Sequence, residues 1–299
     1  MQVCDYCKTD NADDHKFCKE CGNRLKSLVA VEFEHLEDTE QLDLEGMKSK
    51  TFVYSTRGDF DRAVAELVRA IREHPHVPEL HYQLGTVYHK NHRIENAIDE
   101  FERCISLDRR HFKALLKLGN IYGEEVRSHE MAVRIYKLAV EVKPDYPDLR
   151  NNLGNAYRFL GRNEDAVEQF SKAIELNPRY ARAMFNLGKA FSAMGTFQEA
   201  EKQYRRALEV DRNHAKAHKN LGETLMELGR VKEALDFFAA AVGIDPSYVN
   251  GHMEFAKALE KSGRHDDAVR QAEAALKLRP ELGSVEKILS EPSITQGGR

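Results

Sequence analysis

The sequence predicts an all-α solenoid made of stacked pairs of short helices, with a small metal-binding module at its N-terminus. Two observations predict the solenoid. Small residues recur every 34 residues over most of the chain, and a Leu-Gly pair recurs at nearly the same spacing. A third observation predicts the metal module, because four of the five cysteines lie within the first 21 of the 299 residues.

Composition and charge exclude several classes of protein. The 45 Lys and Arg residues stand against 49 Asp and Glu, and this net charge of −4 argues against bulk electrostatic binding to nucleic acid or anionic lipid. No stretch approaches the roughly 18 consecutive apolar residues of a membrane span. The start, MQVCDYCKTD, lacks the basic and apolar regions of a secretory signal, so we expect a cytoplasmic protein.

Residues 1–26 form the predicted metal module. Two C-x-x-C pairs, ten residues apart, supply its ligands, Cys4, Cys7, Cys18 and Cys21. Each pair can bring two thiolates onto one metal, so the four predict a closed, structural site for one Zn²⁺. The alternatives are a redox dithiol, or His15 in place of one cysteine. The segment resembles the short zinc-ribbon modules found at the termini of prokaryotic proteins.

Residues 27–43 are expected to be an acidic, solvated linker. The stretch 27–46 contains seven acidic residues and no Lys or Arg. Alternation of Val29, Val31 and Phe33 leaves open a short strand against the zinc module.

The remainder of the chain is predicted from three repeated positions. An alanine recurs 34 residues apart, with one step of 35, at Ala63, Ala97, Ala132, Ala166, Ala200, Ala234 and Ala268. Twelve or thirteen residues before it a glycine follows a leucine, at Gly85, Gly119, Gly154, Gly188 and Gly222. These positions predict two amphipathic helices per period that approach closely at the small residues. Glycines between the two helices suit a left-handed C-cap, at Gly58, Gly161, Gly195, Gly229 and Gly263.

This pattern closely resembles the tetratricopeptide repeat (TPR), over about 240 of the 299 residues. The resemblance implies a right-handed superhelix with seven repeats, at 44–77, 78–111, 112–146, 147–180, 181–214, 215–248 and 249–282. The first repeat is degenerate, and the third carries one extra residue, expected in the turn between Glu124 and Met131. Residues 283–290 are expected to form a capping helix, and 291–299 a disordered tail.

In TPR proteins the first helix of each pair lines a concave groove that typically holds an extended peptide. The residue before Leu-Gly is an asparagine in three consecutive repeats, at Asn152, Asn186 and Asn220. This resembles the asparagine ladder of O-GlcNAc transferases, whose amides can pair with any peptide backbone. That interpretation expects the three amides to have no obligatory partner in the free protein. The alternative is that they join neighbouring repeats.

A second resemblance, to the carboxylate clamp of cochaperones, is incomplete. Asn155, Asn186 and Lys216 fall at three of its five positions, as do Asn120, Asn152 and Arg182, but its first and last basic residues are replaced. A patch of Arg182, Lys189, Lys216 and Lys219 favours an acidic peptide. The predicted peptide-binding residues are Asn120, Asn152, Asn155, Arg182, Asn186, Lys189, Lys216 and Asn220.

No motif in the sequence predicts catalysis. Phosphate-binding and nucleophile-elbow motifs are absent, and Cys104 occupies a small-residue packing position typical of a buried thiol. Five histidines cluster in sequence, and solvated or capping roles are expected for them instead of a second metal site: His74, His76, His81, His89 and His92.

These features together predict a non-catalytic scaffold that binds a protein or peptide partner, with the zinc ribbon as a second contact surface. A nucleic-acid-associated regulator is disfavoured by the balanced charge of residues 1–26. The targeting subunit of a separate enzyme remains a third hypothesis, and the oligomeric state stays open.

Overall fold

The computed structural model describes residues 2–3, 10–11 and 44–290. The chain divides into two compact units, Met1–Pro144 (unit 1) and Asp145–Arg299 (unit 2). The predicted zinc ligands, the linker and the C-terminal tail lie outside the described residues. Of the predicted metal module, the structure describes only the short strands β1 (Gln2–Val3) and β2 (Asp10–Asn11). These strands pair antiparallel, with Gln2 opposite Asn11.

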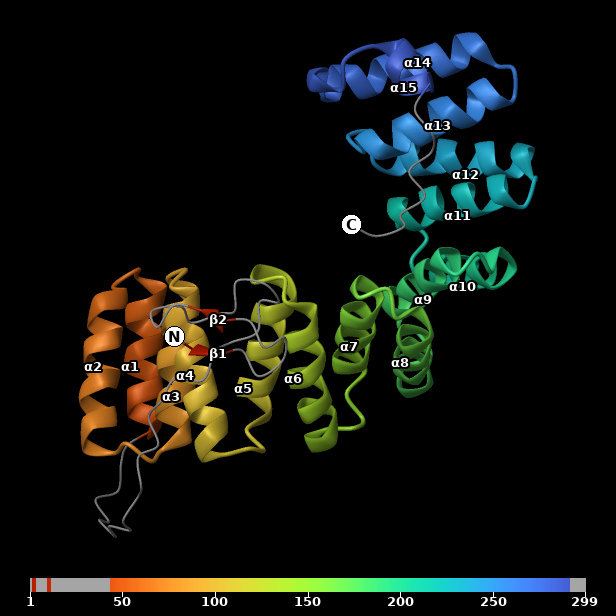
Figure 1. Ribbon diagram of the computed structural model, residues 1–299. Coiled ribbons are helices and arrows are strands. Elements are labelled where there is room, and N and C mark those ends of the chain that lie inside the picture. The colour runs from red at the N-terminus through yellow and green to blue at the C-terminus, as the bar shows by residue number, and fades with distance from the viewer. Residues whose placement is uncertain (1, 4–9, 12–43, 291–299) are drawn as a thin grey trace. The chain divides into compact units, whose positions relative to one another are not determined.

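The described residues of unit 1 form three helix pairs, and the two helices of each pair pack against each other (orange to yellow in Figure 1). Their bounds are α1 Leu44–Thr56, α2 Phe60–Glu73, α3 Pro78–Lys90, α4 Ile94–Leu107, α5 Phe112–Asn120 continued by the π-helix η1 Ile121–Glu125, and α6 His129–Val142. The all-α repeat architecture predicted from the sequence is confirmed here.

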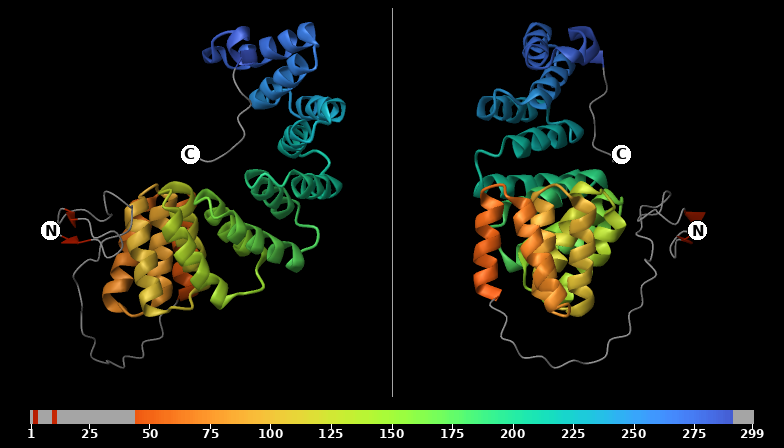
Figure 2. Two further views of the ribbon diagram at one scale, coloured as in Figure 1. Left: turned by 45° about the vertical axis from the view of Figure 1, so that its right-hand side comes forward. Right: turned by 90° about the vertical axis from the view of Figure 1, so that its left-hand side faces the viewer.

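Unit 2 contains four further pairs, drawn from green to blue in Figures 1 and 2. They are α7 Pro147–Phe159, α8 Asn163–Leu176, α9 Ala181–Ala193, α10 Phe197–Val210, α11 Ala215–Glu227, α12 Val231–Ile244, α13 Val249–Lys261 and α14 His265–Leu278. A 3₁₀ turn, Pro280–Leu282, leads to α15, Val285–Ser290. Ile288 of α15 is buried in a cluster with Met253 and Ala272, so this helix covers the apolar end of the last pair.

The small residues allow the close helix contacts that the sequence predicts. A Cβ atom added at Gly188 on α9 would lie 2.6 Å from Cε1 of Tyr204 on α10. Tyr204 is itself buried, in a cluster with Ala200, Leu221 and Phe238. The glycine is therefore required by the packing of the second helix against the first.

The turns inside the helix pairs use left-handed backbone, as predicted. Gly161 has φ +72°, and the corresponding glycines of four other turns are similar. His92 and Arg127 occupy this position in the second and third repeats, with φ of +56° and +57°. A non-glycine residue there is strained by its Cβ atom.

The extra residue of the third repeat lies elsewhere than expected. The turn after η1 has the usual three residues, 126–128, and the insertion is instead absorbed in the π-helix, where Val126 N–H donates to the carbonyl of Ile121 at 2.9 Å. The expectation of a longer turn between Glu124 and Met131 is wrong. A π-turn accommodates one residue without displacing the start of the next helix.

At two equivalent positions of the repeat, a buried histidine joins the helices of a pair through polar contacts. His81 is buried, with Nδ1 2.7 Å from Glu100 Oε2 and Nε2 3.2 Å from the carbonyl of Pro75. His252 repeats the arrangement with Gln271 and Pro246. His81 is thus neither solvated nor capping, and that part of the histidine prediction is wrong.

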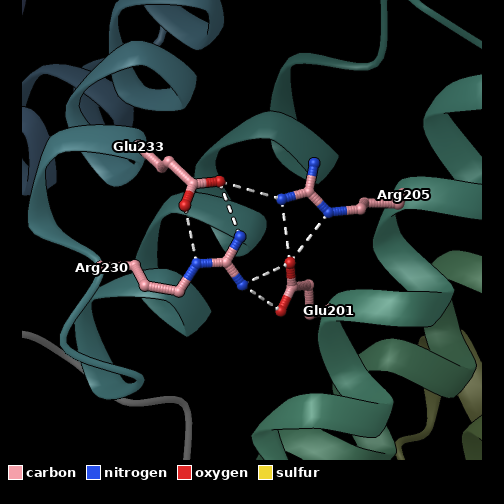
Figure 3. Close-up of polar contacts among 4 residues, drawn as sticks. All are labelled: Glu201, Arg205, Arg230 and Glu233. Atoms are coloured by element: carbon pink, nitrogen blue, oxygen red, sulfur yellow. Dashed lines mark hydrogen bonds and ion pairs between the residues drawn. The ribbon is translucent and has the colours of Figure 1, made fainter.

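An ion-pair network joins the second helices α10 and α12 (Figure 3). Arg230 contacts Glu201 Oε2 and Glu233 Oε2, each at 2.7 Å, and Arg205 contacts the same two carboxylates. All four charges are mutually neutralised at the surface. The network therefore has a structural role between two repeats.

Candidate functional site

Unit 2 contains a pocket of ≈ 340 Å³, which we call the unit 2 pocket. Its polar lining comes from the first helices of four successive pairs, through Arg158, Lys189, Asn220, Glu223, Glu254 and Lys261. Tyr204 and Phe238, from the second helices α10 and α12, also line it. The sequence places polar residues here because they lie on the helix face opposite the buried alanines and leucines.

One side of the pocket is cationic. Arg158 and Lys189 make no ion pair with any described residue, and Arg158 Nε is buried without a hydrogen-bond partner. The guanidinium lies 4.4 Å from the ring centroid of Phe159. Burial, together with the nearby charges of Arg158, Lys219 and Lys216, lowers the pKa of Lys189 to about 8.

The other side carries buried ion pairs. Lys219 Nζ lies 2.7 Å from Glu223 Oε2, and Lys257 Nζ lies 3.0 Å from Glu254 Oε1. Burial raises the pKa of Glu223, although Lys219 opposes the increase. These carboxylates are engaged by lysines of their own helices, α11 and α13.

Tyr204 connects the two sides. Its hydroxyl lies 3.2 Å from Ser192 Oγ and accepts a hydrogen bond from Asn220 Nδ2 at 3.4 Å. Burial raises the pKa of Tyr204 to about 12, so the hydroxyl stays neutral at physiological pH. The pocket thus combines three cations, several carboxylates, a phenol and an amide, and its cationic side, formed by Arg158 and Lys189, suits a polar or anionic ligand.

The asparagine ladder differs from the expectation of three amides without partners. Asn186 is buried and donates through Nδ2 to Asn151 Oδ1 at 2.9 Å, so this amide joins two repeats. Asn151 in turn approaches Asn152 Oδ1 at 3.5 Å, and Asn220 is bonded to Tyr204. The expectation of amides without partners is therefore wrong for all three asparagines, and Asn220 alone of the three lines the unit 2 pocket.

The remaining predicted residues are dispersed. Asn120 belongs to unit 1, where its Oδ1 accepts from Tyr136 OH at 2.8 Å. Arg182 and Lys216 are exposed, in the first turns of α9 and α11, and Asn155 is half-buried on α7. Lys219 is buried and paired with Glu223, so it does not belong to a free basic patch. Lys189 is the predicted cation that the structure places in the pocket.

Sequence reasoning missed Arg158, Glu223 and Glu254. A signal existed for Glu223, because the position after Leu-Gly is Asn155, Lys189 and Glu223 in three successive repeats. Residues at one repeat position lie in a row along the helix pairs. A change of charge along that row indicates that these side chains are not required for packing between helices. Arg158 has no such signal, since its equivalents are Ser192 and Met226.

The described ranges contain neither a metal-binding cluster nor a reactive thiol. No group of three His, Cys, Asp or Glu side chains there is arranged to hold a metal ion. Cys104 is buried, and this burial raises the pKa of its thiol to about 12, which makes it a poor nucleophile. Among the helices that the structure describes, none has the length and apolar character needed to cross a membrane.

Solved structures support the repeat fold. The pilus biogenesis factor PilW has a TM-score of 0.62 at 22% identity, over 72% of this chain and 99% of that one. A tetratricopeptide repeat protein from Parabacteroides merdae gives 0.62 at 17% identity, over 82% and 96%. YrrB, described as a TPR protein with an unusual peptide-binding site, gives 0.56 at 23% identity, over 66% and 97%.

The sequence comparisons identify the family. The search of curated proteins found no match. Residues 39–291, which include all seven helix pairs, match the family described as the Cilia and flagella-associated protein 70 C-terminal domain. The chain therefore belongs to that TPR-type family.

Proposed function

We propose that the protein is a non-catalytic scaffold and that its unit 2 pocket binds an extended segment of a partner protein. The observation that carries this proposal is the pocket itself, whose polar lining comes from the first helices of four consecutive repeats. A segment that follows these helices meets a side chain from each repeat in turn. The TPR-type fold supports a protein partner.

The chemistry of the pocket supports recognition of a peptide. Asn220 donates one N–H to Tyr204, and its carboxamide still has an acceptor oxygen and a second N–H that can pair with a peptide backbone. Phe238 and Tyr204 provide apolar surface beside the polar groups. Such a mixture of apolar walls and few polar groups is typical of ligand pockets.

We also propose that Cys4, Cys7, Cys18 and Cys21 hold one structural Zn²⁺, in a module that offers a second contact surface. The pairing of β1 with β2 supports this, because it brings together the two ends of the segment 4–9, which contains the first C-x-x-C pair. Zinc would cross-link the two pairs, and no open ligand position would remain for catalysis. Thiolates persist as metal ligands in a reducing compartment, which supports a cytoplasmic location.

Selection of random linear peptides displayed on phage, with the full-length protein as target, tests the pocket. Asn220→Trp would fill it, and Lys202→Trp, on the exposed side of α10, is the matched control. We expect selected peptides to bind Asn220→Trp at least about tenfold more weakly and the control unchanged. Lys261→Trp, at the exposed rim of the pocket, is a second blocking variant if Asn220→Trp loses helical signal. No selected peptides, or equal binding to the blocked variants, would contradict the proposal.

A further inference from the structure

We propose that the unit 2 pocket selects a peptide with an aspartate or glutamate side chain, whose carboxylate is held jointly by Arg158 and Lys189. This inference rests on the proposed function and specifies the chemistry of the segment that the pocket binds. A side-chain carboxylate is favoured over a chain terminus because the lining continues past Lys189 onto α11 and α13, so that a segment passes through.

The cations on and near the pocket lining differ in whether an acid lies on the same helix. Lys219 and Lys257 are buried, and each is neutralised by a glutamate on its own helix, four residues after it or three before it. Lys189 has Phe185, Asn186, Ser192 and Ala193 at the equivalent helical positions, and Arg158 has Gly154, Asn155, Gly161 and Arg162. Neither cation can therefore find an acid on its own helix.

Two acids of neighbouring helices that line the pocket are already bonded to lysines. Glu223 is the carboxylate whose charge most directly opposes the low pKa of Lys189, but it is bonded to Lys219. Glu254 is bonded to Lys257. Arg158 and Lys189 thus make no ion pair with any described residue. Glu223 and Glu254 of the pocket lining are bonded to other lysines, and Glu227, the third carboxylate of the lining, is exposed.

A bound carboxylate would offset the free-energy cost of these two unpaired cations. A buried cation without a partner is costly, and a carboxylate between two cations would recover much of that cost through charge-assisted hydrogen bonds. Arg158 Nε, buried and without a hydrogen-bond partner, provides an N–H donor that a carboxylate oxygen can satisfy. A basic peptide side chain would instead meet two like charges, so the site also discriminates by repulsion.

Proton uptake is a consequence of this arrangement. The groups that face Lys189 are Arg158 from α7, Lys216, Lys219 and Glu223 from α11, and the neutral Tyr204 from α10. Lys189 is partly deprotonated near pH 8, and a bound carboxylate raises its pKa. Binding at pH 8.5 is therefore accompanied by uptake of a proton onto Lys189.

The test uses the peptides selected on the full-length protein. We expect them to be enriched in Asp or Glu, and Glu→Gln in a selected peptide to weaken binding by about tenfold or more. Lys189→Gln and Arg158→Gln should each cause a similar loss, Lys189→Arg should retain binding, and Lys202→Gln on α10 should have no effect. Calorimetry at pH 8.5 in two buffers of different ionisation enthalpy should reveal proton uptake with the wild type and none with Lys189→Gln.

The outcomes distinguish this inference from the proposed function. Peptides that require the pocket, by the Asn220→Trp criterion, yet bind Lys189→Gln as well as the wild type would overturn the inference and leave the proposed function intact. Peptides held through a free C-terminus, and lost on amidation, would also overturn it. Absence of any pocket-dependent peptide would overturn the proposed function itself.

Discussion

The side-chain amide of Asn186 on α9 donates a hydrogen bond to the amide oxygen of Asn151 on α7, with 2.9 Å between the two atoms. Both side chains are buried, and the residues belong to consecutive repeats. An asparagine position that resembles a peptide-binding ladder in the sequence thus joins two repeats in the folded chain. Under the proposed function, the partner segment would instead be contacted by Asn220 and by the neighbouring cations Arg158 and Lys189.

Asn186→Ala should lower the free energy of unfolding by about 1–3 kcal/mol, because the amide oxygen of Asn151 loses its buried donor. Asn155→Ala, on the half-buried side of α7, should change it by less than about 0.5 kcal/mol. Urea unfolding followed by circular dichroism measures both. Equal effects at the two positions would show that the Asn186–Asn151 bond contributes nothing to stability.

Gly188→Ala should destabilise the protein by about 1–3 kcal/mol, because the new Cβ would lie 2.6 Å from the ring of Tyr204. The matched change is Gly243→Ala in α12, where a Cβ meets nothing within 4 Å. It should stabilise the protein by about 0.5–1 kcal/mol through helix propensity. Chemical unfolding of the two variants compares them, and a stabilised Gly188→Ala would mean that α9 and α10 pack less closely than described.

His92→Gly and Arg127→Gly should each stabilise unit 1 by about 1 kcal/mol, because both residues have left-handed backbone that glycine adopts without strain. Gly161→Ala tests the converse in unit 2 and should be destabilising, as the added Cβ meets no neighbour and only the backbone is strained. Melting temperatures of the three variants provide the measurement. A lower melting temperature for His92→Gly would indicate that the His92 side chain has a stabilising contact.

Lys189 predicts a specific dependence of stability on pH. Its pKa is about 8 in the folded protein against 10.5 as the ordinary value, so between these limits the unfolded chain binds more protons. Stability should then rise with pH across this window, and below pH 8 the full cost of the buried charge applies. Lys189→Met should accordingly be more stable than the wild type by about 1–3 kcal/mol at pH 7.

The difference between Lys189→Met and the wild type isolates this residue from the tyrosines, which titrate in both proteins. We expect the difference in unfolding free energy to shrink steadily between pH 8 and pH 10.5. Urea titrations at pH 7, 8.5 and 10 measure it. A difference that is constant over this range would mean that Lys189 is not buried as a charge.

The proposed zinc site should be local. Zinc-thiolate binding contributes about 10–16 kcal/mol to the folding of small zinc modules, so chelation or Cys18→Ser should unfold residues 1–26. Helices α1–α15 do not include these residues, and the far-UV helical signal should persist. Elemental analysis should find one zinc per chain; a chain without zinc, or loss of most helical signal on chelation, would contradict the proposal.

The sequence predicted the helices well because their signals are local. Alanine and glycine spacing and glycine turns each act within one period, so α9 and α10 could be expected from residues 181–210. The π-helix at Ile121–Glu125 could not, since an inserted residue fits equally well in a turn or in a helix until the next helix is packed.

The candidate site was predicted only in part. Lys189 and Asn220 followed from their repeat positions, whereas Arg158 did not, because its row contains Ser192 and Met226 in the next repeats. His218 gives a second example. It occupies the position of His81 and His252, but Phe237 stands where their polar partners would be, so its Nδ1 is buried without a partner among the described residues.

By itself, the sequence determined that the chain forms stacked helix pairs, because each apolar stripe depends on residues three and four apart and can be buried only against a neighbouring repeat. Tertiary structure alone decided which polar groups are satisfied. Asn186 bonds Asn151, 35 residues away, and Lys219 bonds Glu223, whereas Lys189 makes no ion pair with any described residue. The physical reason is that hydrogen bonds and ion pairs depend on separations of a few ångströms between helices, which the spacing of residues along one chain does not specify.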